Sequence, residues 1–355
     1  MTAIVFGFIL NYSGSDLFIC SAYYPRWWEV QIPSQRWLIV HQFSAWHVNF
    51  NIALWSFEPQ VKGVHNLIDM ALASPHSTPP HLLYTISIGV LNNKKAIQLV
   101  LPPIINSAAE YRGARPAKEG PIGPESAVGT GYSKSKWVSE RLLEVASAKT
   151  AVNSVIIHVG QICGGPNGFW NENEWLPSLI QYSIHITCLP FSEQVSLIGW
   201  TGVFYNLTYW CIQSISWIPS TSAGRAITEI RHSSSWFVHL AHPHPVPWGT
   251  IFGAFSALLG VPLFPYSEWL ACLEESGKAT REKNDDLWNN PTLRIIEFFR
   301  TDSMGIASAR IISLLLIDEA QKVSETLCDD NIPQLGIEDV KRWLDYWRNM
   351  GLLSQ

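Results

Sequence analysis

The chain has 355 residues, of which 47% are hydrophobic and 15% charged, enough apolar material for one large or two smaller folded domains. A net charge of −5 argues against a nucleic-acid-binding surface. The six cysteines include no Cys-x-x-Cys pair, which favours free thiols in a reducing compartment over disulfides or a zinc site. We therefore expect a cytoplasmic protein that binds no metal and no nucleic acid.

The first half of the chain alternates short apolar runs with stretches of helical periodicity. The expected strands are 37–41, 81–87 and 152–159, and the expected helices are 57–72 and 133–148. Strands that alternate with helices are typical of βαβ units, so we expect an α/β fold with a parallel sheet.

Beyond about residue 214 the pattern changes, because His, Pro and Trp become frequent and helical periodicity dominates after residue 250. The range 337–350 is the best-marked helix. Its apolar face is formed by Val340, Trp343, Leu344 and Trp347, at i, i+3, i+4 and i+7.

These patterns divide the chain into four segments. We expect a divergent N-terminal segment at 1–36, an incomplete Rossmann-like core at 37–190, an insertion at 191–213, and a mainly helical C-terminal subdomain that binds the substrate at 214–355.

Tyr132 and Lys136 form the first chemical signal, since they lie four residues apart at the expected start of a helix. Positions i and i+4 share one helix face, so the ammonium group of Lys136 can lie beside the phenol of Tyr132. A neighbouring positive charge lowers a tyrosine pKa from about 10 and eases proton donation to a developing alkoxide. The same spacing also occurs by chance on amphipathic helices.

Ser87 and Gly160 end two of the expected strands, and α/β sheets place reactive groups at the carboxyl ends of their strands. The hydroxyl of Ser87 can hold a carbonyl oxygen while Tyr132 protonates it. An ordinary strand-end serine is the simpler interpretation of Ser87 alone, so the order Ser87, Tyr132, Lys136 and then Gly160-Gln161 carries more weight.

Taken in order, these residues resemble the extended short-chain dehydrogenase/reductase superfamily. The closer resemblance is to the thioester reductase domain of fungal adenylate-forming reductases and non-ribosomal-peptide-synthetase-like enzymes. The matching stretches are 46–51, 56–59, 63–69, 129–140, 159–165, 170–177, 242–248, 260–262, 265–270 and 320–324.

The resemblance implies a Rossmann-like fold and NADPH-dependent reduction of an acyl thioester carried on the phosphopantetheine arm of a carrier domain. The product would be an aldehyde, and a second reduction would give an alcohol. The catalytic residues implied are Ser87, Tyr132 and Lys136. Lys136, Gly160 and Gln161 would lie at the nicotinamide end of the cofactor.

The chain also departs from the family. It contains no Gly-x-Gly-x-x-Gly or Gly-x-x-Gly-x-x-Gly turn, so we expect the first βαβ unit to be missing and the domain to be truncated at its N-terminus. His158 stands where the family carries arginine. An inactive fragment or pseudoenzyme of the same family is therefore the alternative hypothesis.

The segment 195–213 interrupts the resemblance, and we interpret it as a loop insertion or a retained intron. A transcript that reads through it intact would contradict the intron. A membrane helix is the competing interpretation, because no charged residue lies between Glu193 and Arg225. Polar residues interrupt the run, however, whereas a spanning helix needs about 20 mainly apolar residues. We therefore expect no membrane association.

Overall fold

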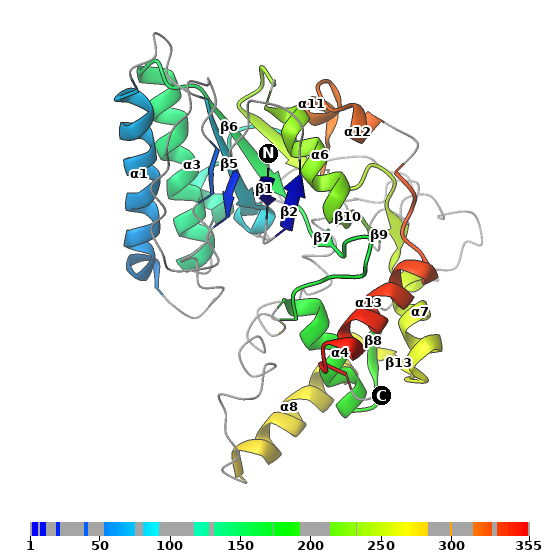
Figure 1. Cartoon of the computed structure of the whole chain (residues 1–355). Helices are drawn as coiled ribbons and strands as arrows, with labels where there is room; N and C mark the ends of the chain where they lie inside the picture. Colours follow the sequence, from blue (N-terminus) through cyan, green and yellow to red (C-terminus); the bar gives the residue numbers. More distant parts are fainter. Residues whose placement is uncertain are drawn as a thin grey trace, which may run out of the picture.

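A computed structural model gives the fold of the chain (Figure 1). It describes residues 2–5, 8–11, 19–21, 39–41, 53–74, 81–91, 117–127, 131–172, 174–191, 214–231, 233–282, 299, 315–328 and 332–353.

The centre of the α/β part is a parallel sheet of three strands in the order β11-β6-β5. They are β5 (Leu82–Ser87), β6 (Ser154–Val159) and β11 (Phe237–Leu240). Ser87 pairs with Val159, so the carboxyl ends of β5 and β6 lie at one edge. This arrangement confirms the expected α/β fold with a parallel sheet.

Four strands precede the first helix of the described residues. The hairpin of β1 (Thr2–Val5) and β2 (Phe8–Asn11) is antiparallel, whereas β3 (Ile19–Ser21) and β4 (Ile39–His41) pair in parallel. Strand β4 also contacts β5. The expected strand 37–41 is thus found as β4, and three strands lie in 1–36, where the sequence shows little periodicity.

Helices cover both faces of the sheet. In Figure 1, α1 (Glu58–Leu72) and α3 (Gly131–Lys149) lie side by side on one face. On the other face lie α6 (Ser220–Ile230), α11 (Asp318–Gln321) and α12 (Glu325–Cys328). Three short 3-10 turns accompany these helices, at Leu54–Phe57, Ile88–Leu91 and Pro124–Ala127.

The side chains of β6 explain this layering, because successive residues of a strand point to opposite faces. Val155, Ile157 and Val159 pack with α6, while Ile156 packs with α1 and α3. All six residues of β6 are buried, as expected for a strand covered on both faces.

A second, mainly helical part lies below the sheet in Figure 1. Its helices are α4 (Trp175–His185), α7 (Trp248–Leu259), α8 (Tyr266–Glu282) and α13 (Ile337–Asn349). Its parallel strands are β8 (Leu189–Phe191) and β13 (Leu263–Pro265). The core of this part is rich in tryptophan and includes Trp170, Trp217, Trp269, Trp343 and Trp347.

Two further strand pairs connect the parts. Strand β7 (Ile162–Cys163) pairs with β10 (Ile218–Pro219), and β9 (Ser214–Ile215) pairs with β12 (Val246–Pro247). The chain thus returns to the sheet after residue 214, through β10, α6 and β11. The division into four segments stays a prediction, and residues 218–240 lie in the α/β layer.

The periodic helices expected from the sequence are confirmed as α1, α3 and α13, with their ends moved by one or two residues. In α13 the four expected core residues, Val340, Trp343, Leu344 and Trp347, are all buried. Val138 and Leu142 of α3 are only half-buried.

None of the helices in the described ranges has the length and apolar character needed to cross a membrane. The segment 195–213, on which the membrane alternative rested, lies outside the described residues.

Candidate active site

Ser87 and Tyr132 meet at the carboxyl edge of the sheet. Ser87 is the last residue of β5, and Tyr132 is the second residue of α3. A hydrogen bond joins their two side chains. The ring of Phe57 packs edge-on against the ring of Tyr132, with 6.1 Å between centroids. The fold therefore brings together two of the three residues that the sequence suggested as catalytic.

Lys136 lies one turn further along α3. Its Nζ atom is 5.4 Å from the centroid of the Tyr132 ring, and the residue is only 2% exposed. Burial lowers the pKa of Lys136 from 10.5 to about 7, because the charged ammonium form loses its hydration. The predicted trio is thus assembled in space, although its roles stay predictions.

The lowered pKa that we expected for Tyr132 is wrong. We expected Lys136 to lower its pKa, but burial raises the pKa of Tyr132 to about 12, and only the hydrogen bond with Ser87 opposes this shift. With its own pKa near neutrality, Lys136 carries only part of a positive charge at pH 7. Tyr132 is therefore a protonated hydrogen-bond donor throughout the neutral range.

Gly160 and Gln161 follow β6 at the same carboxyl edge. The backbone N–H of Gly160 donates to the carbonyl oxygen of Leu240, 2.8 Å away, and so continues the pairing with β11. The amide oxygen of Gln161 accepts from Nε1 of Trp175 at 2.7 Å, and its amide nitrogen donates to Glu174 Oε2 at 3.0 Å. The side chain of Gln161 is therefore held by protein groups.

Glu174 is a residue whose importance sequence reasoning missed. Its Oε2 atom accepts hydrogen bonds from both Gln161 and Nε1 of Trp170, the latter at 2.9 Å. Burial raises the pKa of this carboxyl, and the two hydrogen bonds oppose the shift. An acidic residue between two tryptophans, in the stretch 170–175, was the available signal.

A buried polar pair lies beneath α3, further from the edge. Nε2 of His158 on β6 lies 3.1 Å from Oε2 of Glu140 on α3, and both side chains are fully buried. The ring of His239 on β11 is next to His158, with 5.2 Å between centroids. This pair attaches the helix that carries Tyr132 and Lys136 to the sheet that carries Ser87.

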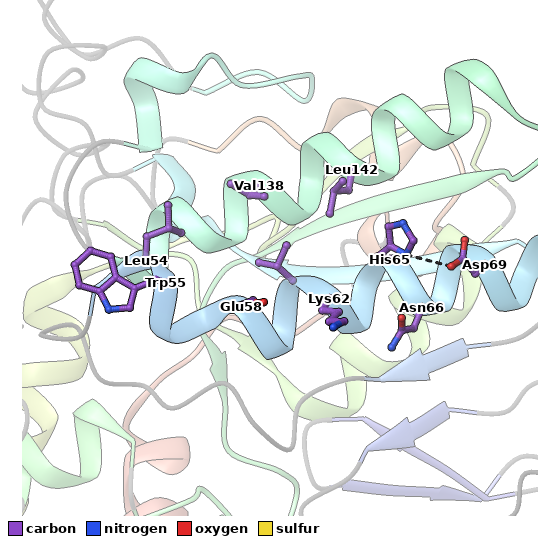
Figure 2. A pocket seen from close by; sticks show the side chains of 10 residues that line it. Leu54, Trp55, Glu58, Lys62, His65, Asn66, Asp69, Val138 and Leu142 are labelled. Carbon is purple, nitrogen blue, oxygen red and sulfur yellow. Dashed lines mark ion pairs between the residues drawn. The ribbon is translucent and has the colours of Figure 1, made fainter.

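A groove of about 680 Å³ runs along the outer side of α1 and α3 (Figure 2). It is lined by Leu54, Trp55, Glu58, Val61, Lys62, His65, Asn66, Asp69, Val138 and Leu142. Ser87, Tyr132 and Lys136 do not line it, so this groove is separate from the candidate active site.

The residues present fit one end of a nicotinamide cofactor. A buried amine beside a phenol and a hydroxyl, at the carboxyl edge of a parallel sheet, provides the donors that a ribose and a carbonyl oxygen require. The sequence has no glycine-rich turn for a pyrophosphate. Within the described ranges, no group of three or more His, Cys, Asp and Glu side chains could hold a metal ion.

A parallel sheet covered by helices on both faces places the chain among the Rossmann-like α/β proteins. Residues 38–198 match the family model of the male sterility proteins, a model of NAD-binding domains. The chain is similar in sequence to the fungal adenylate-forming reductases, and it shares its fold with terminal reductase domains of non-ribosomal peptide synthetases.

Two curated relatives illustrate this homology. An adenylate-forming reductase, Nps10, of Heterobasidion annosum is 38% identical over 328 residues, which cover 88% of this chain and 26% of the relative. A carboxylic acid reductase of Neurospora crassa is 26% identical and matches 87% of this chain and 27% of its own length. The chain thus spans about a quarter of the length of these relatives.

Solved structures share the fold. The terminal R domain from the myxalamid PKS-NRPS biosynthetic pathway superposes with a TM-score of 0.61 and 19% identity, covering 90% of this chain and 70% of that domain. The reductase domain of a non-ribosomal peptide synthetase from Mycobacterium tuberculosis gives a TM-score of 0.55 and 18% identity, covering 90% and 71%. Both confirm the Rossmann-like fold.

Proposed function

We propose that this chain reduces an acyl thioester to an aldehyde at the site formed by Ser87, Tyr132 and Lys136, with NADPH as the reductant. The observation that carries the proposal is the hydrogen bond between the side chains of Ser87 and Tyr132, with the Lys136 amine beside the Tyr132 ring. The homology to adenylate-forming and carboxylic acid reductases supports the reaction class.

In this proposal the two hydroxyl groups act on the carbonyl oxygen of the substrate. A bound NADPH would supply the hydride that reduces the thioester carbonyl carbon. Negative charge then develops on the carbonyl oxygen, where hydrogen bonds from Ser87 and Tyr132 stabilise it. Tyr132 transfers its proton to that oxygen, and the hemithioacetal breaks down to aldehyde and thiol.

Lys136 supports the proton transfer. When protonated, its ammonium group stabilises the phenolate that Tyr132 leaves behind. Its amine also lies where it can bind the ribose of the nicotinamide. The partner that delivers the substrate would be a phosphopantetheine-bearing carrier domain. A solved thiolation-reductase di-domain of an archaeal non-ribosomal peptide synthetase, which is similar in fold, supports this partner.

The direct test is a turnover assay with an acyl-pantetheine thioester, followed by the loss of NADPH absorbance and by detection of the aldehyde. Tyr132→Phe removes the proton donor and is expected to lower kcat by a factor of about 10²–10⁴. Ser87→Ala removes one oxyanion donor and is expected to lower kcat by about 10²–10³. Turnover that survives both substitutions unchanged would contradict the assignment.

A pseudoenzyme of the same family is the second candidate, and the missing glycine-rich turn favours it. NADPH titration followed by cofactor fluorescence separates the two. Saturable binding supports the reductase. Absence of binding up to millimolar NADPH, in protein with cooperative thermal unfolding, supports the pseudoenzyme.

A further inference from the structure

The side-chain amide of Gln161 has a fixed orientation. Its Oε1 atom accepts from Trp175, and its Nε2 atom donates both to Glu174 and to the backbone carbonyl of Ile162, the last at 2.6 Å. Reversing the amide would set its NH₂ group against an indole N–H and its oxygen against a carboxyl oxygen. Only one of the two amide orientations is therefore compatible with these partners.

Glu174 is the centre of this arrangement. A single carboxyl oxygen, Oε2, accepts from the amide of Gln161 and from the indole of Trp170. Glu174 immediately precedes α4, and its side chain does not cap that helix. Its hydrogen-bonding capacity is directed toward Gln161, not toward the helix end.

Trp170 connects Glu174 to the terminal helix. Its side chain is 2% exposed, and its ring packs edge-on against Trp343 of α13, with 4.9 Å between centroids. Its carbonyl oxygen accepts from Nε1 of Trp347, also on α13, at 3.2 Å. A continuous series of hydrogen bonds thus runs from α13 through Trp170 and Glu174 to Gln161, at the carboxyl edge of the sheet.

We propose that Glu174 and Trp170 are positioning residues that hold the Gly160-Gln161 segment in place for the nicotinamide end of the cofactor. This inference rests on the proposed reductase function. The segment is fixed on its other side by the hydrogen bond from Gly160 to Leu240. Removing the Glu174 carboxylate takes away one of the three partners of the Gln161 amide. Removing the Trp170 indole takes away one of the two donors that hold Glu174, and both changes leave β6 paired.

The test compares two buried indoles of the same core. Trp170→Phe removes the donor to Glu174. Trp269→Phe is the matched control, since Trp269 is fully buried and its Nε1 donates to Ser183 Oγ at 3.0 Å, outside the series of hydrogen bonds that ends at Gln161.

Both substitutions delete one indole hydrogen bond and should lower the melting temperature to a similar extent. Trp170→Phe is expected to raise KM and Kd for NADPH about tenfold, the equivalent of one lost hydrogen bond, with a smaller change in kcat. Trp269→Phe is expected to leave both constants within about twofold of the wild type. Equal KM values for the two variants would overturn the inference.

Glu174 offers a rescue experiment. Glu174→Ala removes the shared acceptor and should weaken NADPH binding at least as much as Trp170→Phe. Glu174→Gln retains one carbonyl oxygen, which can accept from both Trp170 and Gln161, and should restore most of the affinity. If the glutamine variant bound NADPH as weakly as the alanine variant, the hydrogen-bonding role would be wrong.

The two proposals fail in different ways. If folded wild-type protein neither binds nor oxidises NADPH, the proposed function is wrong, and this inference falls with it. If the wild type turns over but Trp170→Phe matches Trp269→Phe, only the positioning role is wrong.

Discussion

Glu140 Oε2 lies 3.1 Å from Nε2 of His158, and the two fully buried side chains connect helix α3 to strand β6. The second carboxyl oxygen of Glu140 and Nδ1 of His158 have no hydrogen-bond partner among the residues that the structure describes. Each residue therefore depends on the other for its polar contact, so removing either one leaves an unsatisfied group in the interior.

His158→Ala is accordingly expected to lower the free energy of unfolding by about 1–3 kcal/mol, because the Glu140 carboxyl stays buried without its partner. Urea denaturation measures the loss. Glu144→Ala is the control on the same helix, since its partner Arg141 is 42% exposed and a surface pair contributes about 0.2–1 kcal/mol. A loss for His158→Ala no larger than for Glu144→Ala would show that the buried pair adds nothing.

The pH dependence of turnover should follow the protonation state of the Lys136 amine. Its pKa of about 7 means that the ammonium form is lost as pH rises through neutrality. Because Tyr132 has a pKa of about 12, it stays protonated over the same range. If the ammonium form is the active one, kcat/KM falls above pH 7 by about tenfold per pH unit.

Lys136→Arg separates this effect from other titrations, since arginine stays charged at every pH of the assay. The variant is expected to be less active at every pH, because the planar head group of arginine fits the site poorly. Its kcat/KM should, however, no longer fall above pH 7. Wild-type and variant profiles of the same shape would assign the decline to another group.

The free energy of unfolding should rise with pH over the range in which kcat/KM falls. The pKa of Lys136 is lower in the folded protein than its ordinary value of 10.5, so the unfolded chain binds more protons between about pH 7 and 10.5. The free energy of unfolding contributed by this residue therefore rises with pH across that window. The expected result is that the wild type gains stability relative to Lys136→Met from pH 7 to pH 9, measured by urea denaturation. A constant difference would contradict the shift.

The close contact between Gly168 and the terminal helix α13 gives a further prediction. Gly168 has a φ of +81°, and a Cβ atom there would lie 2.0 Å from the backbone oxygen of Arg342 on α13. Gly168→Ala should therefore displace α13 and lower the free energy of unfolding by at least about 1–3 kcal/mol.

Gly253 provides the matched control, since it lies inside α7 and a Cβ atom there would meet nothing within 4 Å. Gly253→Ala is expected to stabilise the protein by up to about 1 kcal/mol, because alanine is the better helix former. Denaturant unfolding of both variants checks the pair. Equal destabilisation by both would exclude the contact with α13 as the cause at Gly168.

The elements with clear periodicity could be predicted from the sequence, and α13 is the best example because its apolar stripe is complete. Strands β1, β2 and β3 were missed, since runs of three or four residues are too short to show a period. The order of Ser87, Tyr132 and Lys136 along the chain led to the prediction of a common site, and the fold brings the three residues together. The pKa of Tyr132 could not be predicted from the sequence, because it depends on burial by residues that are distant along the chain.

The partners of Gln161 were also beyond sequence reasoning. Trp175 and Glu174 reach it only because the start of α4 lies beside the residue pair that follows β6, and no local pattern encodes that approach. The tryptophan-flanked acid at 170–175 marks the place, but its meaning depends on the tertiary structure.

The hydrogen bonds of Glu119 to residues far along the chain determine when its loop can become fixed during synthesis of the protein. Its carboxylate accepts from the backbone N–H groups of His239, Glu319 and Ala320, and so fastens its loop to β11 and to the start of α11. Ala320 lies 201 residues further along the chain. At about 5–20 residues per second, a ribosome needs roughly 10–40 s to deliver that partner. Until then the nascent chain must keep this carboxylate hydrated, so the loop before the Tyr132 helix is fastened late.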